Sequence, residues 1–412
     1  MDLDINFVRN QFPAFSENSL KGKAFFENAG GSYACGQVIN RLNRFYKEKK
    51  VQPYGAFEAS ISGGNEMDEA RVGLARYLGV KDCEVSFGPS TTQNTYVLAQ
   101  AFAEWLVPGN AIIVTNQDHE ANTGSWRRLC NRGVNIREWQ VNKETGELNL
   151  EDLENLLDDN VKLVCFPHCS NIVAHINPVK EIVSRVHSAG GYVCVDGVSY
   201  APHGLPNVED LGADIYLFSS YKTYGPHQGI MVIKEKLAEL LPNQGHYFNE
   251  KFLTKKFTPA GPDHAQIAAC AGIIEYFDML ASHHGIKHSD APSKVHKLFR
   301  DYEKKILQPL LDFVKAKNSA RLLGPSDASK RAPTVALDLK CNSFEVAKKL
   351  SDFNILAGGD DFYAVRLLEA LGVDMKHGAL RISFVHYTIC LLYTSDAADD
   401  TPCVDLGGRR II

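Results

Sequence analysis

The sequence predicts an α/β fold, in which a mostly parallel sheet has helices on both faces, followed by a smaller α+β domain. Between residues 65 and 235, short apolar runs alternate with amphipathic segments, as in buried parallel strands joined by helices. The 412 residues, 44% apolar and 23% charged, suffice for a large core and a second domain. We expect a large domain over 20–265 and a small one formed by 1–19 together with 266–390.

Six strands and three helices are expected in the large domain. The strands lie at the apolar runs 84–88, 111–116, 162–167, 192–197, 215–220 and 229–234. Helical spacing of apolar side chains predicts helices at 66–78, 93–105 and 178–188. Only 221–228 separate the last two strands, which is too short for a crossover helix. We therefore expect that pair to be antiparallel.

The small domain mixes both kinds of element. Helices are expected at 265–281, 293–315, 343–353 and 364–372, and strands at 334–339 and 380–387. Residues 391–412 show no periodicity and resemble the translation of read-through into a sequencing adapter. We expect this tail to be non-native or disordered.

Charge and cysteine content narrow the class of protein. The net charge is −5, and the sequence has neither a long basic run nor a long apolar stretch, which argues against nucleic-acid and membrane partners. Ten scattered cysteines are typical of a cytoplasmic protein with reduced thiols. The cluster at 165–169 lacks a second pair of ligands, so we expect no metal there. The histidine-rich stretch 282–288 is expected to be solvated surface.

The most informative residues are Asp196, at the end of one apolar run, and Lys222, shortly after the next. Ligands of open α/β sheets bind at the carboxyl ends of strands, where we expect both side chains. A lysine there can form a Schiff base with an aldehyde cofactor, and a carboxylate can keep a pyridine nitrogen protonated. Taken singly, each residue has a simpler explanation, a turn aspartate and a solvated lysine.

Hydroxyl side chains begin the helix that follows the first strand. The segment FGPSTTQN (87–94) places Ser90, Thr91 and Thr92 at this helix start. Free backbone N–H groups there can bind a phosphate ester, although the serine can equally be an ordinary helix cap. No GxGxxG or GxxxxGK[ST] pattern occurs, which argues against dinucleotide and P-loop nucleotide binding.

Three more side chains are expected near the same edge of the sheet. His119 offers a flat ring that can stack on a cofactor, or it is an exposed loop histidine. Asn171 can donate a hydrogen bond to a ring hydroxyl. Arg381 carries a guanidinium fork suited to a carboxylate, or to a structural ion pair.

The order and spacing of these segments resemble the class V aminotransferase family of pyridoxal-phosphate enzymes, in particular its cysteine-desulfurase-like branch. The matching segments are FFENAGGS (25–32), STTQN (90–94), DHEAN (118–122), SN (170–171), VDG (195–197), SSYKTYGP (219–226) and RISF (381–384). The resemblance implies fold type I of the PLP-dependent transferases, with a seven-stranded type of sheet. It also implies pyridoxal 5'-phosphate as cofactor and a homodimer.

The resemblance implies a role for each matching residue. Lys222 would hold the cofactor as an aldimine and then move the substrate α-proton. Asp196 would pair with the pyridine nitrogen, and His119 would stack on the ring as the third catalytic residue. Hydroxyls would bind the phosphate, and the candidates are Ser90, Thr91, Thr92, Ser219 and Tyr221.

The substrate side of the site is implied in the same way. Arg381 would clamp the substrate carboxylate, Asn171 would support it or the ring hydroxyl, and Asn28 would line the entry. Tyr221 stands where desulfurases usually carry a phosphate-binding histidine. Pro262 stands in a segment that normally reaches the phosphate of the neighbouring subunit, and it has no N–H to donate.

A departure in the loop LAGGDDFYAV (356–365) bears on the reaction. This loop occupies the place of the catalytic-cysteine loop of desulfurases and contains no cysteine. A persulfide relay needs a thiolate that attacks the substrate sulfur. The nearest cysteines, Cys341 and Cys390, lie outside the loop, so standard desulfuration is disfavoured.

We expect an enzyme that acts on a small amino acid, with C–S or C–Se bond lyase chemistry favoured. An amino-acid epimerase or an aminotransferase on the same fold is the alternative, because removal of the α-proton can lead to each reaction without a thiol. A sulfur acceptor is not identified by the sequence. A protein that binds the cofactor without turnover is a third interpretation, which no DNA-binding segment supports.

Overall fold

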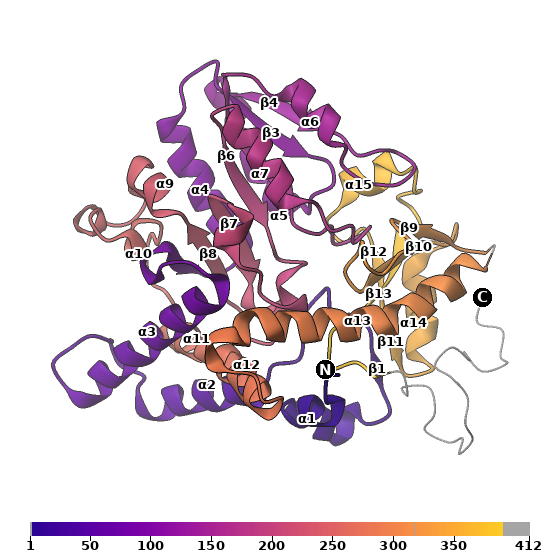
Figure 1. Cartoon of the computed structure of the whole chain (residues 1–412), viewed down its shortest axis with the longest axis horizontal. Coiled ribbons are helices and arrows are strands. Elements are labelled where there is room, and N and C mark those ends of the chain that lie inside the picture. Colours follow the sequence, from indigo (N-terminus) through magenta and orange to yellow (C-terminus); the bar gives the residue numbers. More distant parts are fainter. Residues whose placement is uncertain (1, 318, 390–412) are drawn as a thin grey trace.

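The computed structural model describes residues 2–317 and 319–389 and contains a large seven-stranded sheet (Figure 1). The strand order is β2-β8-β7-β6-β5-β3-β4. The strands are β2 (Val85–Gly88), β3 (Ala111–Thr115), β4 (Asn135–Trp139), β5 (Val161–Pro167), β6 (Tyr192–Asp196), β7 (Ile215–Ser219) and β8 (Gly229–Ile233). Strands β4, β3, β5, β6 and β7 pair in parallel, whereas β8 is antiparallel to β7 and β2. The predicted α/β fold and its antiparallel pair are confirmed.

Helices connect and surround these strands. They are α2 (Gly36–Glu48), α3 (Glu58–Leu78), α4 (Thr91–Trp105), α5 (Glu120–Arg127), α6 (Leu150–Leu156), α7 (Val179–Ser188), α8 (Val208–Leu211), α9 (Glu235–Leu240), α10 (Leu253–Lys256), α11 (His264–Ala269) and α12 (Ala271–His283). The single helix expected at 265–281 is two helices, α11 and α12. Helix α3 starts eight residues before the expected 66, because a polar and glycine-rich start hides its periodicity.

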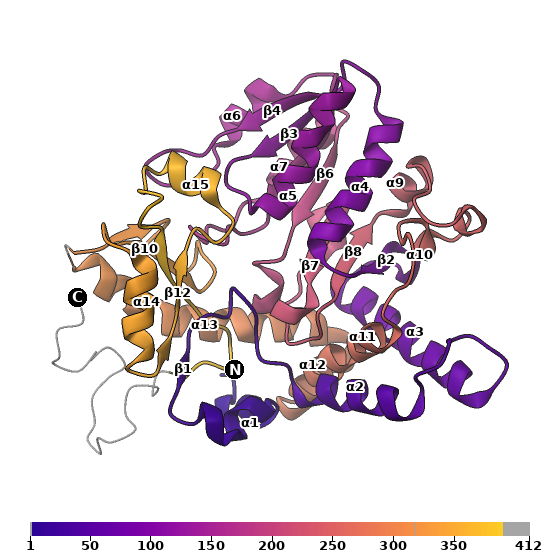
Figure 2. The ribbon, with the colours of Figure 1, turned by 180° about the vertical axis from the view of Figure 1, so that it is seen from behind.

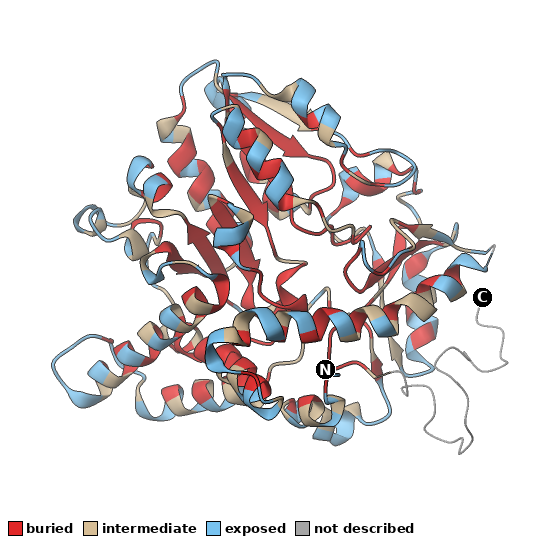
Figure 3. Cartoon of the chain, in the orientation of Figure 1, coloured by how far each residue is buried: buried red, intermediate tan, exposed pale blue. Residues whose placement is uncertain are grey.

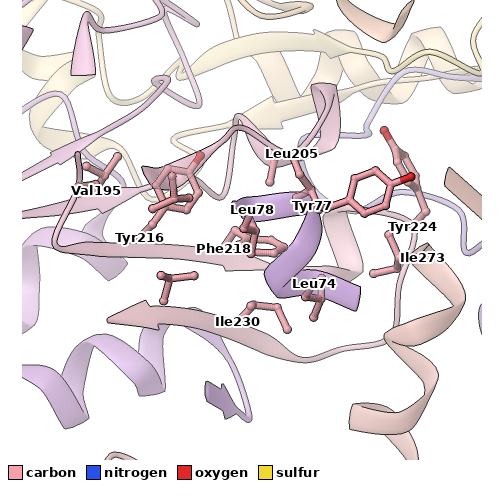
Figure 4. Close-up of a cluster of buried hydrophobic side chains, with 14 of the residues drawn as sticks. Leu74, Tyr77, Leu78, Val195, Leu205, Tyr216, Phe218, Tyr224, Ile230 and Ile273 are labelled. Atoms are coloured by element: carbon pink, nitrogen blue, oxygen red, sulfur yellow. The ribbon is translucent and has the colours of Figure 1, made fainter. Parts of the chain in front are cut away.

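Both faces of the large sheet are buried under helices (Figures 1 and 2). On one face Leu98 of α4 and Trp126 of α5 share an apolar cluster with Leu217 of β7. On the other, Leu74 of α3 lies in a cluster with Phe218 of β7 (Figure 4). Every residue of β3, β7 and β8 is buried (Figure 3), and each large apolar side chain removed from water stabilises the fold by about 1.5–3 kcal/mol. This double coverage explains the continuous apolar runs.

The C-terminal part of the described chain builds a second, antiparallel sheet in the order β12-β13-β10-β9. Its strands are β9 (Arg321–Leu323), β10 (Thr334–Asp338), β12 (Gly358–Asp360) and β13 (Ala379–Ser383), accompanied by α13 (Ala291–Lys315), α14 (Ser343–Ser351) and α15 (Val365–Ala370). A separate parallel pair joins β1 (Ala24–Phe25) to β11 (Ile355–Leu356). The N-terminal strand therefore lies beside the second sheet's elements, as Figure 2 shows.

The histidine-rich stretch expected as solvated surface has a partner, so that expectation is wrong in part. The His283 ring stacks on Phe7 of α1 (Ile5–Asn10), with ring centroids 3.8 Å apart. His283 Nε2 lies 2.9 Å from a carboxylate oxygen of Asp4, and the Asp4 N–H donates to His284. These contacts hold the N-terminal helix against α12.

The division of the chain near residue 265 stays a prediction, and residues 391–412 lie outside the described residues. The strand expected at 380–387 ends at Ser383, because the chain then turns to meet the N-terminal segment. Within the described residues, no helix is long and apolar enough to cross a membrane.

Candidate active site

Two neighbouring strands end at the edge of the large sheet where the predicted site residues lie. Strand β6 ends at Asp196, and Lys222 lies in the turn directly after β7. These two side chains are only 5% and 7% exposed. Gly197 follows Asp196, and a Cβ at this glycine would lie 2.2 Å from the Tyr216 ring. The backbone after β6 therefore requires glycine, which fixes the direction of the chain beside Asp196.

The amine of Lys222 is tuned by its surroundings. Burial lowers its pKa to about 8, and the positive charge of Arg381 acts in the same direction, whereas Asp196 and Glu27 oppose the shift. An amine with this pKa is largely uncharged slightly above pH 8. Lys222 is therefore nucleophilic under mild conditions, as formation of a Schiff base requires.

The pKa of the Asp196 carboxyl group is shifted upward, whereas that of Lys222 is shifted downward. Burial raises its pKa to about 6, against the hydrogen bond from the Val198 N–H and the charge of Lys222. Val198 N lies 2.8 Å from Asp196 Oδ1. Above pH 6 the carboxylate is ionised, and a buried carboxylate strongly favours a positively charged partner.

His119 lies at the start of α5 and is neutral. Its Nδ1 accepts a hydrogen bond from the Ala121 N–H at 3.0 Å, so the imidazole caps the helix and its hydrogen is on Nε2. Burial lowers its pKa to about 3, and Lys222 and Arg381 add to this shift. Lys222 and Arg381 are thus close enough to His119 for their charges to lower its pKa, although the three residues are distant in sequence.

Two of the hydroxyl groups predicted to bind the phosphate, those of Thr91 and Ser219, are adjacent in the structure. Thr91 Oγ1 and Ser219 Oγ are 2.7 Å apart, and both residues are buried. Ser90 caps α4 by accepting from the Gln93 N–H at 3.1 Å. Thr92 is exposed, so its phosphate contact stays a prediction.

Tyr221, the residue before Lys222, is held by packing contacts. Its ring stacks on His227 with centroids 4.8 Å apart, and burial raises the pKa of its hydroxyl. A Cβ at Gly31 would lie 3.5 Å from the Tyr221 ring. Tyr221 is thus positioned by packing, and its contact with the phosphate stays a prediction.

Replacing Ser219 by alanine is expected to weaken pyridoxal-phosphate binding about tenfold. The change removes one hydroxyl from the Thr91–Ser219 pair, and a hydrogen bond to a charged group contributes about 1.5–3 kcal/mol. The dissociation constant is measured by titrating cofactor-free protein and following visible absorbance. Ser188→Ala is the control, because that hydroxyl only donates to the Ser184 carbonyl on α7. Equal affinities of the two variants would contradict the assignment.

Arg381 is almost completely buried and already has partners. Its Nη2 donates to Glu27 Oε1 at 2.5 Å, and its Nη1 lies 3.4 Å from the Asn171 carbonyl oxygen. The Phe362 ring lies 3.8 Å from the guanidinium carbon. Burial lowers the pKa of Arg381, and Glu27 opposes that shift. The guanidinium is held in place, as carboxylate recognition requires, but it is paired with a resident carboxylate.

Asn171 reaches the site from the segment after β5, whereas Asn28 has a structural role. The Asn171 amide donates to the Phe362 carbonyl at 3.0 Å, and its Oδ1 is buried without a partner among the described residues. The Asn28 amide donates to the Ser383 carbonyl at 3.1 Å, and its oxygen accepts from the Tyr387 hydroxyl. Asn28 joins the N-terminal segment to β13, and its predicted contact with substrate stays a prediction.

The loop at 356–365, which contains no cysteine, contacts Arg381 and His119 through its aromatic side chains. Phe362 and Tyr363 both adopt left-handed backbone conformations, with φ of 52° and 56°. Such conformations are unfavourable for bulky residues and mark functional or tightly held segments. The Tyr363 carbonyl accepts from the Glu120 N–H at 2.8 Å, and its ring lies 5.3 Å from that of His119. Aromatic side chains thus occupy the loop in which desulfurases present a thiol.

Neither of the cysteines near this loop in sequence lies in it. Cys341 is exposed, and Cys390 falls outside the described residues. In the segment 165–169, which contains two cysteines and a histidine, the His168 side chain already has a hydrogen-bond partner. Its Nδ1 lies 2.9 Å from the Tyr216 hydroxyl. Over the part of the chain that the structure describes, no group of three His, Cys, Asp or Glu residues could hold a metal.

Two acidic residues of the matching segments at 25–32 and 118–122 belong to the site, although the sequence assigned no role to either of them. Glu27 pairs with Arg381, and Asp118 is close enough to Asp196 for the charge of Asp196 to affect its pKa. The Asp118 carboxyl accepts from Thr115 Oγ1 at 2.6 Å and from Asn122 Nδ2 at 2.9 Å. Burial raises its pKa to about 8, and the nearby Asp196 adds to this shift. An acidic residue beside a motif histidine is indistinguishable in sequence from a solvated one.

The fold and these residues define a class of protein. A mostly parallel seven-stranded sheet that holds a buried lysine and a buried carboxylate at its carboxyl edge is the arrangement of a pyridoxal-phosphate enzyme of fold type I. The chain belongs to the class V aminotransferase family, whose model matches residues 24–389. It is therefore an enzyme of that family, and the resemblance seen in the sequence is confirmed.

Curated relatives cover nearly the whole chain. The aminotransferase-like protein FGM3 of Gibberella zeae is 31% identical over 397 residues, which cover 93% of this chain and 94% of the relative. A cysteine desulfurase of Serratia proteamaculans is 26% identical over 374 residues, covering 86% of this chain and 88% of the relative.

Solved structures share the fold. A cysteine desulfurase from Thermococcus onnurineus NA1 superposes with a TM-score of 0.80 at 22% identity, covering 94% of this chain and 95% of that chain. The cysteine desulfurase CsdA from Escherichia coli gives a TM-score of 0.79 at 20% identity, with the same coverage. A protein called C-DES, with glycine covalently linked to its PLP cofactor, gives 0.73 at 15% identity, covering 92% and 95%.

Pyridoxal phosphate is the cofactor of this family, and the residues present fit it. Lys222 and Asp196 influence each other's pKa, yet no ion pair joins them among the described residues. A cofactor with an aldehyde and a ring nitrogen at opposite ends satisfies both groups. The Thr91 and Ser219 hydroxyls would supply hydrogen-bond donors for the phosphate. Asn171 Oδ1 is a buried acceptor that has no donor among the described residues.

Proposed function

We propose that this enzyme cleaves the bond between Cβ and sulfur, or selenium, in a small L-amino acid. The observation that carries the proposal is the Lys222 amine, which is buried at the carboxyl edge of the sheet. Burial and the charge of Arg381 lower its pKa to about 8, and the charge of Asp196 opposes this shift. An amine of this kind can take a proton from a carbon that the cofactor has made acidic. The relatives named cysteine desulfurase support a sulfur-containing substrate.

Each residue has a definite task in this reaction. Arg381 binds the substrate carboxylate, Lys222 takes the proton from Cα, and Asp196 holds the charge of the pyridine nitrogen. His119 is neutral, so it adds a flat surface without a second positive charge. When bound, pyridoxal phosphate supplies the electron sink that makes loss of the α-proton possible.

The loop at 356–365 supports elimination rather than transfer of sulfur to the enzyme. No cysteine is present there to attack the substrate sulfur, so the sulfur leaves with the electron pair of the C–S bond. With cysteine as substrate, cysteine and water give pyruvate, ammonia and hydrogen sulfide, which balances in atoms and requires no oxidant. Selenium would leave in the same way from selenocysteine.

A substrate panel tests this function. Purified holoenzyme is incubated in turn with cysteine, cysteine sulfinate, selenocysteine, alanine and glutamate, while sulfide, pyruvate and visible absorbance are recorded. Sulfide and pyruvate in equal amounts are expected from cysteine. Exchange of the α-hydrogen in D₂O with inversion would instead establish an epimerase. Transfer of an amino group from one of these amino acids to an added 2-oxo acid would establish an aminotransferase. Spectral shifts without any product would indicate binding alone.

We also propose a homodimer, and a cytoplasmic location. Large apolar side chains are exposed on and beside α2 and α3, namely Ile39, Tyr46, Tyr54, Phe57 and Ile61, a concentration typical of a protein interface. The eight described cysteines are free, which supports a reducing compartment. Analytical sedimentation of wild-type protein is expected to give twice the chain mass of 45.6 kDa, and a monomer at micromolar concentration would contradict the dimer.

A further inference from the structure

The carboxylate of Glu27 forms an ion pair with Arg381, the arginine that is proposed to bind the substrate. Glu27 Oε1 accepts from Arg381 Nη2 at 2.5 Å, while the Arg381 side chain is 4% exposed and that of Glu27 is 28% exposed. The second oxygen, Glu27 Oε2, is buried and has no hydrogen-bond partner within residues 2–317 and 319–389. A charged oxygen left in this state is unfavourable, so the Glu27 position is not optimised for stability alone.

The surroundings of Arg381 leave few of its N–H groups free to bind a substrate carboxylate. Its face is covered by the Phe362 ring at 3.8 Å, and Nη1 is directed to the Asn171 carbonyl oxygen at 3.4 Å. Arg381 Nε is buried and has no partner in the described part of the chain. A substrate carboxylate that seeks two parallel N–H groups of this arginine therefore meets Glu27 at Nη2.

We infer that Glu27 is a specificity-determining residue, which competes with the substrate carboxylate for Arg381. Binding of a carboxylate requires Glu27 to move away from Nη2 or to share it at the cost of repulsion between two negative charges. An amine without a carboxylate meets no such competition. Glu27 thus lowers the affinity for simple anions, and it favours substrates whose remaining contacts compensate for its displacement.

The backbone around Glu27 limits where its side chain can go. A Cβ at Gly358 on β12 would lie 2.7 Å from Glu27 Oε2, and one at Gly30 would lie 2.8 Å from Oε1. Glycine at both positions leaves space for the carboxylate beside Arg381. A Cβ at Gly358 would also lie 2.9 Å from the Phe362 ring, whereas the nearest atoms to one at Gly30 all belong to Glu27. Alanine at either position is expected to displace the Glu27 carboxylate from the arginine while its charge is retained.

The test measures binding of propionate, which is alanine without its amino group, to the cofactor-loaded protein by calorimetry. Glu27→Gln is expected to bind propionate roughly tenfold more tightly than wild type, because a close charge competitor is removed. Glu275→Gln is the matched control, since it neutralises another glutamate that pairs with a buried arginine, Arg41, at 2.9 Å. Its propionate affinity is expected to equal that of wild type.

A double-variant cycle ties the gain to the arginine. In an Arg381→Gln background, Glu27→Gln is expected to leave propionate binding unchanged. Gly358→Ala provides a second route if Glu27→Gln does not fold, and it should raise the affinity in the same direction. Weaker or unchanged binding in Glu27→Gln, or an equal gain without Arg381, overturns the inference.

The inference rests on the proposed function for its view of the substrate, but the two fail separately. Absence of sulfide or pyruvate in the substrate panel would overturn the proposed reaction and leave the propionate result intact. Unchanged propionate affinity would overturn the role of Glu27 and leave the reaction intact. A parallel titration with propylamine, which lacks a carboxylate, is expected to show no gain in the Glu27 variant.

Discussion

Replacing Lys222 by alanine is expected to lower kcat/KM for the amino-acid substrate by about 10⁴-fold or more. The change removes both the nucleophile for the cofactor aldehyde and the base for the substrate proton, and each of these functions contributes several orders of magnitude. Steady-state kinetics gives the rate. Borohydride reduction followed by peptide mapping locates the attached cofactor, which is expected on Lys222 in wild type and absent from the variant.

Lys256→Ala is the control for the loss of a buried lysine. Lys256 is also buried, but its amine donates to the Ala238 carbonyl at 2.7 Å and to that of Glu239. It is expected to retain cofactor labelling at Lys222. Labelling of any other residue in wild-type protein, or full activity in Lys222→Ala, would remove the basis of the active-site assignment.

Replacing Asp196 by asparagine is expected to lower kcat/KM by about 10³-fold and at the same time to stabilise the cofactor-free protein. The activity falls because a neutral amide does not hold a positive charge on the ring nitrogen. The stability rises because burial raises the pKa of Asp196 to about 6 from an ordinary value of 3.8. The folded protein therefore keeps this proton between about pH 4 and 6, where the unfolded chain has lost it.

The stability effect has a defined pH dependence. In wild type the free energy of unfolding decreases as pH rises from about 4 to 6, and asparagine removes this loss. The variant is expected to be about 1–3 kcal/mol more stable than wild type at pH 7.5, with no difference from this source at pH 4. Urea denaturation of both proteins without cofactor measures it. Asp158→Asn is the control, because the Arg137 guanidinium lowers the pKa of Asp158, and this surface variant should gain nothing. A less stable Asp196→Asn protein at pH 7.5 would contradict the argument.

The buried strands could be predicted from the sequence because the hydrophobic effect is the dominant factor in which residues they contain. Strands β5, β6 and β7 are covered on both faces, so their sequences are continuously apolar, and their bounds were within one residue of the expected ones. Strand β4 was missed. It is an edge strand with polar residues in NIREW, and only its last residue is buried. The short strands β9, β11 and β12 contain at most two consecutive apolar residues each. Such short runs do not distinguish a strand from a loop, so only pairing in three dimensions defines these strands.

Some residues of the candidate site could likewise be placed from the sequence, and others could not. Asp196 and Lys222 could be placed from sequence because the ends of parallel strands meet at one edge, and the structure brings them together. The hydrogen bonds of Asn28 could not be foreseen, because its partners Ser383 and Tyr387 are more than 350 residues away. Nor could the Glu27–Arg381 pair, since no local pattern distinguishes a glutamate that will face an arginine from the second sheet.

That pair has a consequence for biosynthesis. Glu27 and Arg381 are 354 residues apart, and at translation rates of 5–20 residues per second the glutamate waits roughly 20–70 seconds before its arginine is made. The strands of the large sheet leave the ribosome during that interval and can pair. Asp196 and Lys222 are therefore both made well before Arg381. Among these residues, the one proposed to bind the substrate carboxylate is synthesised last.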